Sequence, residues 1–208
     1  MLRPLAFSFT LFTLLVFSNC FSYRTLPLGK DYVCEIYEPE DKIPLETLEE
    51  AEKMYFEAYL FPPLHSNIPL EKLNIDPNNF NSYEGYIKDM FRKDFSSYGK
   101  PDKPRLHYLQ LRQRNNGSIV GLCVVLHQQK HGHYYIDHIG IDSKFRRQGL
   151  ATQLLKITVS QFSDFIEISL DTRIFNFPAQ ALYEKLGFRK CSIYSCPEKQ
   201  LSYFHYKL

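Results

Sequence analysis

The stretch from Arg146 to Ala151 places two arginines and a glycine directly before a helical pattern. The first N–H groups of a helix have no partner within the helix, and the helix dipole favours an anion beside them. Glycine lets a ligand approach the backbone closely, and the arginines add positive charge. The sequence therefore predicts an anion-binding loop whose typical ligand is a phosphate.

The segments on either side of this loop have the patterns of a strand and a helix. Residues 134–141 are aromatic and β-branched, as strands are. After the loop, apolar side chains recur with helical spacing at Ala151, Leu154, Leu155, Thr158, Val159 and Phe162. The loop lacks the glycine patterns of dinucleotide-binding folds and of NTPase phosphate loops, which disfavours both ligand classes. Taken alone, it also fits an ordinary strand-turn-helix corner.

A second cluster follows at residues 176–188. Pro178 stands near the start of a helical pattern, and Gly187 follows its end, as is typical of helix boundaries. Tyr183 lies on the apolar face of this pattern. In isolation, a tyrosine at such a position is most simply a core residue.

Together the two clusters resemble the GCN5-related N-acetyltransferase (GNAT) superfamily. The acetyl-CoA loop of that family reads Arg/Gln-x-x-Gly-x-Gly/Ala, and Arg146, Gly149 and Ala151 match it. Its later segment reads Asn-x-x-Ala-x-x-x-Tyr-x-x-x-Gly-Phe, which is matched by Asn176, Ala179, Tyr183, Gly187 and Phe188. The separation of the clusters also fits, and the resemblance is specific from about residue 106 onward.

The resemblance implies that acetyl-CoA is the co-substrate and that no metal is used. The pyrophosphate would bind backbone N–H groups between Arg147 and Thr152, and the pantetheine arm would pair like an extra strand with the edge at Ile139 to Ile141. Asn176 would support the arm. The implied cofactor-binding residues are Ile139, Ile141, Arg146, Arg147, Gln148, Gly149, Leu150, Ala151, Thr152 and Asn176.

The implied reaction is direct attack of a primary amine on the thioester, with Tyr183 beside the sulfur. A tyrosine with a pKa near 10 stays protonated at neutral pH, so it can donate to a thiolate whose conjugate acid has a pKa of about 8.5. Many relatives carry a glutamate base on the strand before the loop, where this chain has Tyr135. Asp171, at the end of the next predicted strand, is the second candidate base.

Alternation along a strand predicts that, of the neighbours Asp137 and His138, only Asp137 shares the face of Tyr135. The base assignment has an alternative, in which Tyr135 is a core residue, Asp171 caps a turn and a chain of water molecules removes the proton.

Periodicity predicts helices over 45–60, 83–95 and 178–186, besides the one after the loop. Strands are expected at 32–38, 106–112, 118–126, 134–141, 165–171, 190–195 and 201–208. Residues 64–80 are expected to form a loop and 101–104 a linker. This order predicts an α/β (α+β), GNAT-like fold: a mixed, mostly antiparallel sheet of six to seven strands, helices on both faces and a central βαβ acetyl-CoA unit.

The first residues carry a leader pattern, an apolar run from Leu5 to Phe17 after a single charge at Arg3. The run is shorter than the roughly 20 residues of a bilayer span and suits a signal peptide. We therefore expect a leader at 1–22 and one acetyltransferase domain at 23–208, in a secreted or extracytoplasmic protein. An uncleaved leader would make a membrane anchor, and a mispredicted start codon would leave the protein cytoplasmic.

Composition limits the partners. With a net charge of +2 and no long basic run, the chain of 208 residues is not expected to bind nucleic acid. Membrane contact is expected only through residues 1–22. The acceptor would be a small-molecule amine or an amine of a peptide or protein, and residues 61–104 would select it.

Cysteines and histidines give weaker signals. Without the leader four cysteines remain, an even number that is compatible with disulfides. Cys123 lies in an apolar strand pattern and is expected to be a buried thiol, whereas Cys191 and Cys196 are close enough to pair. Three histidines cluster between two predicted strands, and we expect an exposed polar loop rather than a metal site at His127, His131 and His133.

Two other functions stay open. The missing strand glutamate and the leader also fit a non-catalytic acyl-CoA-binding or interaction domain on the same fold. An exported structural protein that uses the fold as a scaffold is the third candidate.

Overall fold

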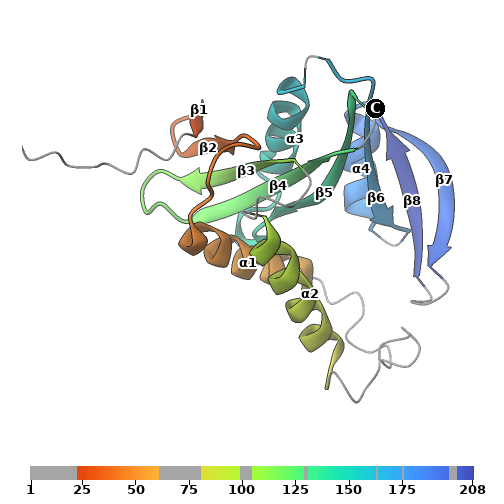
Figure 1. Ribbon diagram of the computed structural model, residues 1–208, viewed down its shortest axis with the longest axis horizontal. Coiled ribbons are helices and arrows are strands. Elements are labelled where there is room, and N and C mark those ends of the chain that lie inside the picture. Colours follow the sequence, from red (N-terminus) through yellow and green to blue (C-terminus); the bar gives the residue numbers. More distant parts are fainter. Residues whose placement is uncertain are drawn as a thin grey trace, which may run out of the picture.

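The computed structural model describes residues 23–60, 81–98, 105–128, 131–162, 164–174, 176–196 and 201–208. The described residues form one eight-stranded sheet with helices on both faces (Figure 1). The strands are β1 (Arg24–Leu28), β2 (Tyr32–Tyr37), β3 (Leu106–Gln113), β4 (Ile119–His127), β5 (His133–Ile141), β6 (Glu167–Arg173), β7 (Arg189–Cys196) and β8 (Leu201–Lys207). The helices are α1 (Leu45–Leu60), α2 (Tyr83–Ser97), α3 (Leu150–Ser160) and α4 (Phe177–Lys185). The predicted leader, the loop 64–80 and the linker 101–104 lie outside the described residues.

The strands follow the order β1-β2-β3-β4-β5-β6-β8-β7 across the sheet. The β5–β6 pair is parallel, and the other described pairs are antiparallel. Helix α3 connects the two parallel strands, so β5, α3 and β6 form the central βαβ unit. The mixed, mostly antiparallel sheet predicted from the sequence is confirmed.

The sheet has one strand more than the six to seven predicted. The added strand is β1, which pairs with β2 across a turn at Gly29, where φ is +66°. Pro27 lies inside β1 and cannot donate a ladder hydrogen bond. Proline argues against a central strand but is tolerated at a sheet edge, which is where β1 lies.

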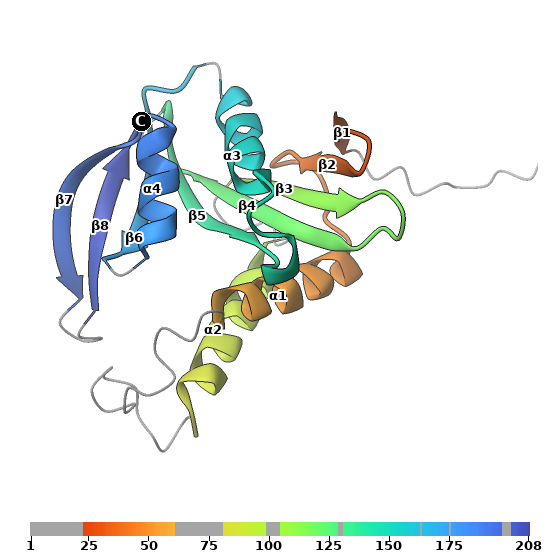
Figure 2. The ribbon, with the colours of Figure 1, turned by 180° about the vertical axis from the view of Figure 1, so that it is seen from behind.

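The helices form two layers on opposite faces of the sheet. Helices α1 and α2 lie together below the sheet in Figure 1, and α3 and α4 lie in front of it in the reverse view of Figure 2. Each layer encloses its own apolar core: Tyr108 and Leu122 face α1 and α2, whereas Leu109 and Cys123 face α3 and α4. No helix in the described ranges is both long and apolar enough to cross a membrane.

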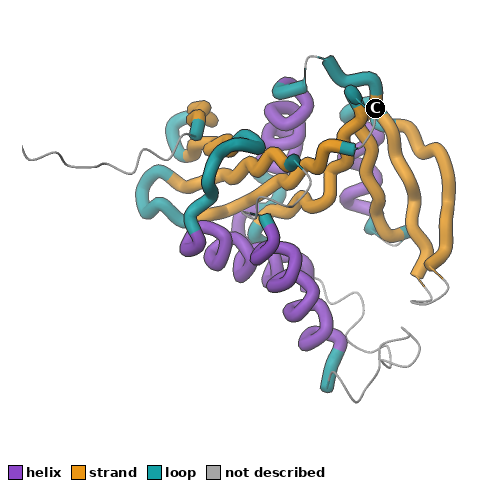
Figure 3. The backbone as a smooth tube through the Cα atoms, in the orientation of Figure 1, coloured by secondary structure: helices purple, strands orange, loops and turns teal. Residues whose placement is uncertain are grey.

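Strands β5 and β6 pair along only part of their length. The pairing runs from His133 to Ile136 on β5 and from Glu167 to Leu170 on β6. Beyond Ile136, β5 pairs with β4 alone as far as Ile141, and the two parallel strands diverge (Figure 3). Within the described chain, the residues from Asp137 to Ile141 thus lie at an open edge in the middle of the sheet.

A β-bulge lies where the two strands part. Val125 of β4 is opposite Ile136, and Val124 is opposite His138, which leaves Asp137 as an extra residue on β5. A bulge bends its strand and interrupts the alternation of side chains.

The bulge corrects one prediction. Both Asp137 and His138 face α1 and α2: the Tyr98 hydroxyl donates to Asp137 Oδ2 at 3.2 Å, and the His138 ring packs on Tyr55 with 4.9 Å between centroids. The prediction that only Asp137 shares the face of Tyr135 is therefore wrong. Regular alternation holds only in an unbulged strand.

Candidate active site

The loop before α3 has an unusual backbone. Gly149, the N-cap residue of α3, has φ +77°, and no side chain caps the helix. Arg147 also has a positive φ, +65°, which costs a non-glycine residue about 1–2 kcal/mol. Such strain is typical of functional sites, and left-handed residues next to a helix start turn N–H groups toward one point. The Tyr32 hydroxyl anchors the loop by donating to Gln148 Oε1 at 2.9 Å.

The side chain of Arg146 ties the loop to the rest of the fold. Its Nε donates to the Ile141 carbonyl at 3.2 Å, and its Nη2 donates to the Ala58 carbonyl at 2.5 Å. Ala58 lies in the last turn of α1, which has no basic residue of its own. Burial lowers the pKa of the guanidinium. Arg146 thus supplies positive charge to a helix C-terminus, and its contact with a cofactor stays a prediction.

The open edge of β5 leads away from this loop. Ile141 is buried and Ile139 packs against the same core as α3. Between them, a Cβ on Gly140 would lie 2.6 Å from Tyr55 Cδ2, so this position accepts only glycine while Tyr55 stays in place. The ring of Tyr55 therefore packs directly on the strand at its open edge.

Tyr183 of α4 lies in the core on the other face of the sheet. It is 5% exposed and packs against Tyr206 and Phe188, with 5.7 Å and 6.0 Å between ring centroids. Burial raises its pKa, with a smaller contribution from Cys123. The pKa of Tyr55 is raised by burial and then by the charge that Tyr183 would carry. This interaction acts across the sheet, because Tyr55 belongs to the core on one face and Tyr183 to the core on the other.

Asn176 is the N-cap of α4. Its Oδ1 accepts the Ala179 N–H at 3.4 Å, and Pro178 stands in the first turn. This contact explains why the Asn-x-x-Ala spacing occurs here, since an asparagine cap bonds the N–H group three residues on. Support of a cofactor arm by Asn176 stays a prediction.

Three polar side chains on neighbouring strands form a continuous hydrogen-bonded chain. The Tyr135 hydroxyl donates to Asp171 Oδ2 at 3.0 Å, and His205 Nδ1 lies 2.7 Å from Asp171 Oδ1. The structure thus brings the two candidate bases together and adds His205, which sequence reasoning missed. His205 lies opposite Asp171 because β8 pairs with β6, and that pairing cannot be read from the sequence.

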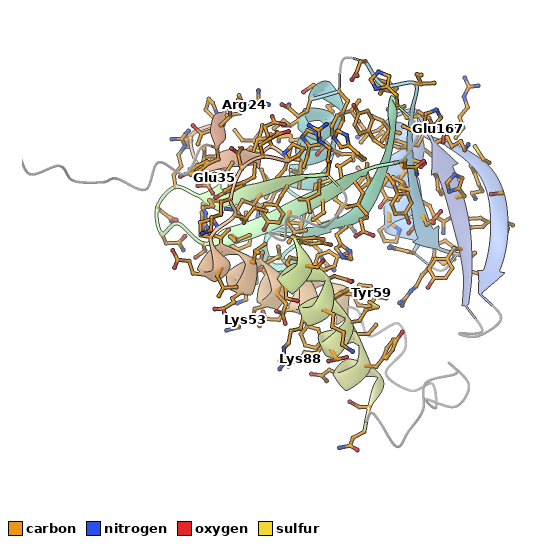
Figure 4. The ribbon with its side chains drawn as sticks, viewed as in Figure 1. Arg24, Glu35, Lys53, Tyr59, Lys88 and Glu167 are labelled. Carbon is orange, nitrogen blue, oxygen red and sulfur yellow. The ribbon has the colours of Figure 1, made fainter. Side chains whose placement is uncertain are left out.

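The hydrogen-bonded side chains of Tyr135, Asp171 and His205 lie on the face of the sheet that α1 and α2 cover. Arg173, two residues beyond Asp171 on β6, stacks over the ring of Tyr59 at 4.8 Å. Figure 4 shows Tyr59 at the end of α1 that lies nearer to β6 and β8. Burial lowers the pKa of Arg173, and Tyr203 of β8 opposes this, first through the charge that it would carry and then through a hydrogen bond. The reach of α1 therefore extends to the β6–β8 half of the sheet.

The histidine cluster differs from its prediction. His127 is the last residue of β4, and His133 is the first residue of β5. The pairing of the two strands continues up to His127, which lies opposite Tyr134. His127 stacks on His107 with 4.8 Å between centroids, and the His133 side chain is 11% exposed. The predicted exposed loop is therefore wrong for these two residues and holds for His131, which is 89% exposed. Across the described segments, no group of three or more potential metal ligands is arranged to hold an ion.

The described cysteines are free thiols. Cys34 and Cys123 are buried and Cys191 is exposed, and the side chain of Cys196 lies outside the described part of the structure. Burial raises the pKa of Cys123 to about 12. The thiolate is the nucleophilic form of cysteine, so Cys123 is a poor nucleophile although it lies near Tyr183.

Comparison with known proteins gives one assignment. An N-alpha-acetyltransferase of Saccharolobus solfataricus is 40% identical over 62 residues, which cover 28% of this chain and 37% of that protein. The chain therefore spans less than two fifths of that relative. The ribosomal-protein-S18-alanine N-acetyltransferase structure from Escherichia coli superposes with a TM-score of 0.55 at 19% identity, over 84% of this chain and 92% of that one.

The PaiA N-acetyltransferase of Thermoplasma acidophilum, crystallised with coenzyme A, superposes with a TM-score of 0.56 at 14% identity, over 84% of this chain and 99% of that one. At these identities the two structures establish likeness of fold. The model of the acetyltransferase (GNAT) family matches residues 71–188, more than half of the sequence. The chain belongs to the acetyltransferase (GNAT) family.

Proposed function

We propose that the chain is an acetyl-CoA-dependent N-acetyltransferase that transfers an acetyl group to a primary amine by direct attack. The observation that carries this proposal is the divergence of β5 and β6 between the strained loop at Arg147 and the buried phenol of Tyr183. An open strand edge suits the amide groups of pantetheine, and the uncapped start of α3 suits a pyrophosphate. The fold neighbour crystallised with coenzyme A is consistent with this cofactor.

In this proposal Tyr183 protonates the departing thiolate. Its burial keeps the phenol protonated, since burial disfavours the charged form. The same surroundings also raise the pKa of a thiol, as they raise that of the nearby Cys123 to about 12. The thiolate formed there would be a stronger base than in water. Burial thus raises the pKa of the donor and of the acceptor together, so Tyr183 stays protonated and can still donate to the sulfur as the thiolate departs.

The base would be the chain formed by Tyr135, Asp171 and His205. The amine must lose a proton before or during its attack on the thioester carbon. His205 can take up that proton as an imidazolium whose charge the carboxylate of Asp171 balances. Tyr135 would hold the acceptor amine, or one water molecule, at the other oxygen of Asp171.

Direct attack is favoured over an acyl-enzyme intermediate. Cys123 is the described thiol whose charge would affect the pKa of Tyr183. Its own raised pKa leaves it protonated at neutral pH, so it is a poor nucleophile for forming an acyl-enzyme.

We extend the proposal to partners and location. The acceptor is an amine of a small molecule, a peptide or a protein. Residues 1–22 act as the leader of a secreted or extracytoplasmic protein, with membrane contact through that segment alone.

The test is acetyl transfer from acetyl-CoA across a panel of amines, with Tyr183→Phe as the variant. We expect kcat to fall by roughly 10²–10⁴-fold, the range of general acid–base catalysis, with unchanged affinity for coenzyme A. Tyr206→Phe is the matched control, because its ring borders the same core while its hydroxyl bonds Glu184 instead, at 3.1 Å.

Two outcomes would contradict the proposal. Folded protein that binds no coenzyme A would remove its basis. Normal coenzyme A binding without turnover on any amine would favour the non-catalytic acyl-CoA-binding domain.

A further inference from the structure

Four polar side chains converge where the C-terminal end of α2 meets the bulge of β5. They are Asp94 and Tyr98 from the helix and Asp137 and His138 from the strand, and we call them the open cluster. His138 Nε2 lies 3.7 Å from Asp94 Oδ2 and 3.7 Å from Asp137 Oδ2. The Tyr98 hydroxyl donates to Asp137 Oδ2 at 3.2 Å. None of these residues has a role in the mechanism proposed above.

His138 is a buried polar side chain without a hydrogen-bond partner at one nitrogen. It is 8% exposed, and its ring is surrounded by Tyr55, Phe91, Phe95 and Tyr98. Among the described residues, Nε2 makes no hydrogen bond, because both carboxylates lie beyond hydrogen-bond distance. Leaving a buried polar atom unsatisfied costs about 1–3 kcal/mol. Such an atom therefore calls for an explanation, and a ligand is the direct one.

The charge around His138 Nε2 specifies the ligand. Two carboxylates flank the nitrogen, and the last turn of α2 carries no basic residue to balance the negative end of the helix dipole. The side chains of Asp94 and Asp137 are 43% and 30% exposed, so a solute can reach them. The site therefore favours a cation.

An ammonium group fits these acceptors. It has three N–H donors, and the open cluster offers one oxygen each from Asp94 and Asp137, both 3.7 Å from His138 Nε2. We propose that the open cluster binds a second, protonated nitrogen of the acceptor, so that the preferred substrates carry two amines. This inference rests on the proposed acetyltransferase function.

The bound nitrogen cannot be the one that reacts. Two carboxylates stabilise the charged form of an amine and raise its pKa, whereas the attacking amine must be neutral. The reacting nitrogen would instead lie at Tyr135, two residues before Asp137 on the same strand. At about 3.3 Å per residue, that separation is about 7 Å along β5, within the span of one short diamine.

The experiment compares acceptors that differ in one charge. Diamines with three to six carbons and monoalkylamines of equal length are assayed for kcat/KM with acetyl-CoA. We expect the best diamine to exceed its monoamine by at least tenfold, the effect of one charged hydrogen-bonded contact. Asp94→Asn and Asp137→Asn should reduce that ratio to near the statistical factor of two for two equivalent amines.

Asp89→Asn is the matched control. Asp89 lies on α2 as well, but pairs with Lys93 at 2.6 Å outside the open cluster. This variant should keep the wild-type preference for the diamine. Thermal unfolding of each variant separates a lost contact from a lost fold.

A binding measurement makes the inference independent of turnover. Calorimetric titration with 1,4-diaminobutane, with and without coenzyme A, should show binding to the wild type and loss of binding in Asp94→Asn. Equal use of diamine and monoamine, together with no diamine binding, overturns the inference even when transfer occurs. Diamine binding that Asp94→Asn abolishes, in a protein that transfers no acetyl group, supports the cation site and rejects the proposed function instead.

Discussion

Polar and charged side chains gather at two places on the sheet face beneath α1 and α2, and only one of the two sets is satisfied. On β2 and β3, Glu35 Oε2 accepts from Gln110 at 2.5 Å and from Arg112 at 3.0 Å, and Arg112 also pairs with Glu50 of α1 at 3.0 Å. We call these four residues the closed network, and Figure 4 labels Glu35 there. At the bulge of β5, the open cluster leaves His138 Nε2 without a partner among the described residues.

The difference follows from the strand pairing beneath each set. The closed network stands on β2 and β3, and β3 has a partner on both sides, with β2 in regular register and with β4 across a bulge at Arg112. The open cluster stands on a bulge, beside an edge that β6 does not pair. A satisfied buried network stabilises one structure, whereas an unsatisfied one is suited to bind something. In our proposal, one face of one sheet thus divides into a structural part and a ligand-binding part.

Breaking the closed network should have the largest effect on stability. Arg112→Met leaves the carboxylate of Glu35 buried without its cation, which we expect to cost about 3 kcal/mol. Chemical denaturation measures this loss, and kcat/KM of the folded fraction should stay within twofold of the wild type. A tenfold loss of kcat/KM at unchanged stability would contradict the division of the face.

Asp171→Asn should produce the opposite pattern. The substitution keeps the shape of the side chain but removes the charge that would balance a protonated His205, so we expect kcat to fall roughly 10–100-fold. The pH–rate profile should change on its acidic side, while the free energy of unfolding changes by less than about 1 kcal/mol. Unaltered kcat and pH profile would remove Asp171 from the base. His205→Asn tests the same chain from its other end.

Arg147→Gly should increase the stability of the fold and weaken the binding of coenzyme A. Glycine adopts a positive φ without strain, so the variant should gain up to about 1 kcal/mol in the free energy of unfolding. It also loses a positive charge beside the predicted pyrophosphate, so the dissociation constant of coenzyme A should rise. Denaturation and calorimetry measure the two effects. A gain in stability with undiminished affinity would show that the strain of Arg147 has no part in cofactor binding.

The smallest effect is expected for the stability of Asp94→Asn. Asp94 makes no hydrogen bond with His138, and its side chain is 43% exposed, so its neutralisation removes only interactions that the solvent screens. We expect the free energy of unfolding to change by less than about 0.5 kcal/mol. A loss comparable to that of Arg112→Met would mean that the open cluster is a structural ion pair like the closed network.

Much of the fold was predictable from local patterns. The bounds of α1 follow from apolar spacing and were predicted to the residue, and the face of α3 that holds Leu154 and Leu155 is buried as expected. The loop at Gly149 and the start of α4 near Pro178 were found because glycine and proline have local conformational reasons to stand there. These features depend on neighbours along the chain.

What the sequence did not reveal depends on pairing across the sheet. His205 joins Asp171 only through the β6–β8 register, and His138 turns toward α2 only because β5 has a bulge. Arg146 has the position of a phosphate ligand in the motif, yet its guanidinium bonds the end of α1, a contact between residues 88 positions apart. No local pattern carries such information.

The central claim is that the loop before α3 binds coenzyme A, and one calorimetric titration tests it most directly. Gly149→Ala and its control Gly117→Ala each place alanine at a similar positive φ, +77° and +73°, so both should lose about 1–2 kcal/mol of stability. Only Gly149 lies at the predicted site. We expect one coenzyme A per wild-type chain and per Gly117→Ala chain, with clearly weaker binding by Gly149→Ala. Equal affinity in all three proteins, or no binding by the folded wild type, would contradict the claim.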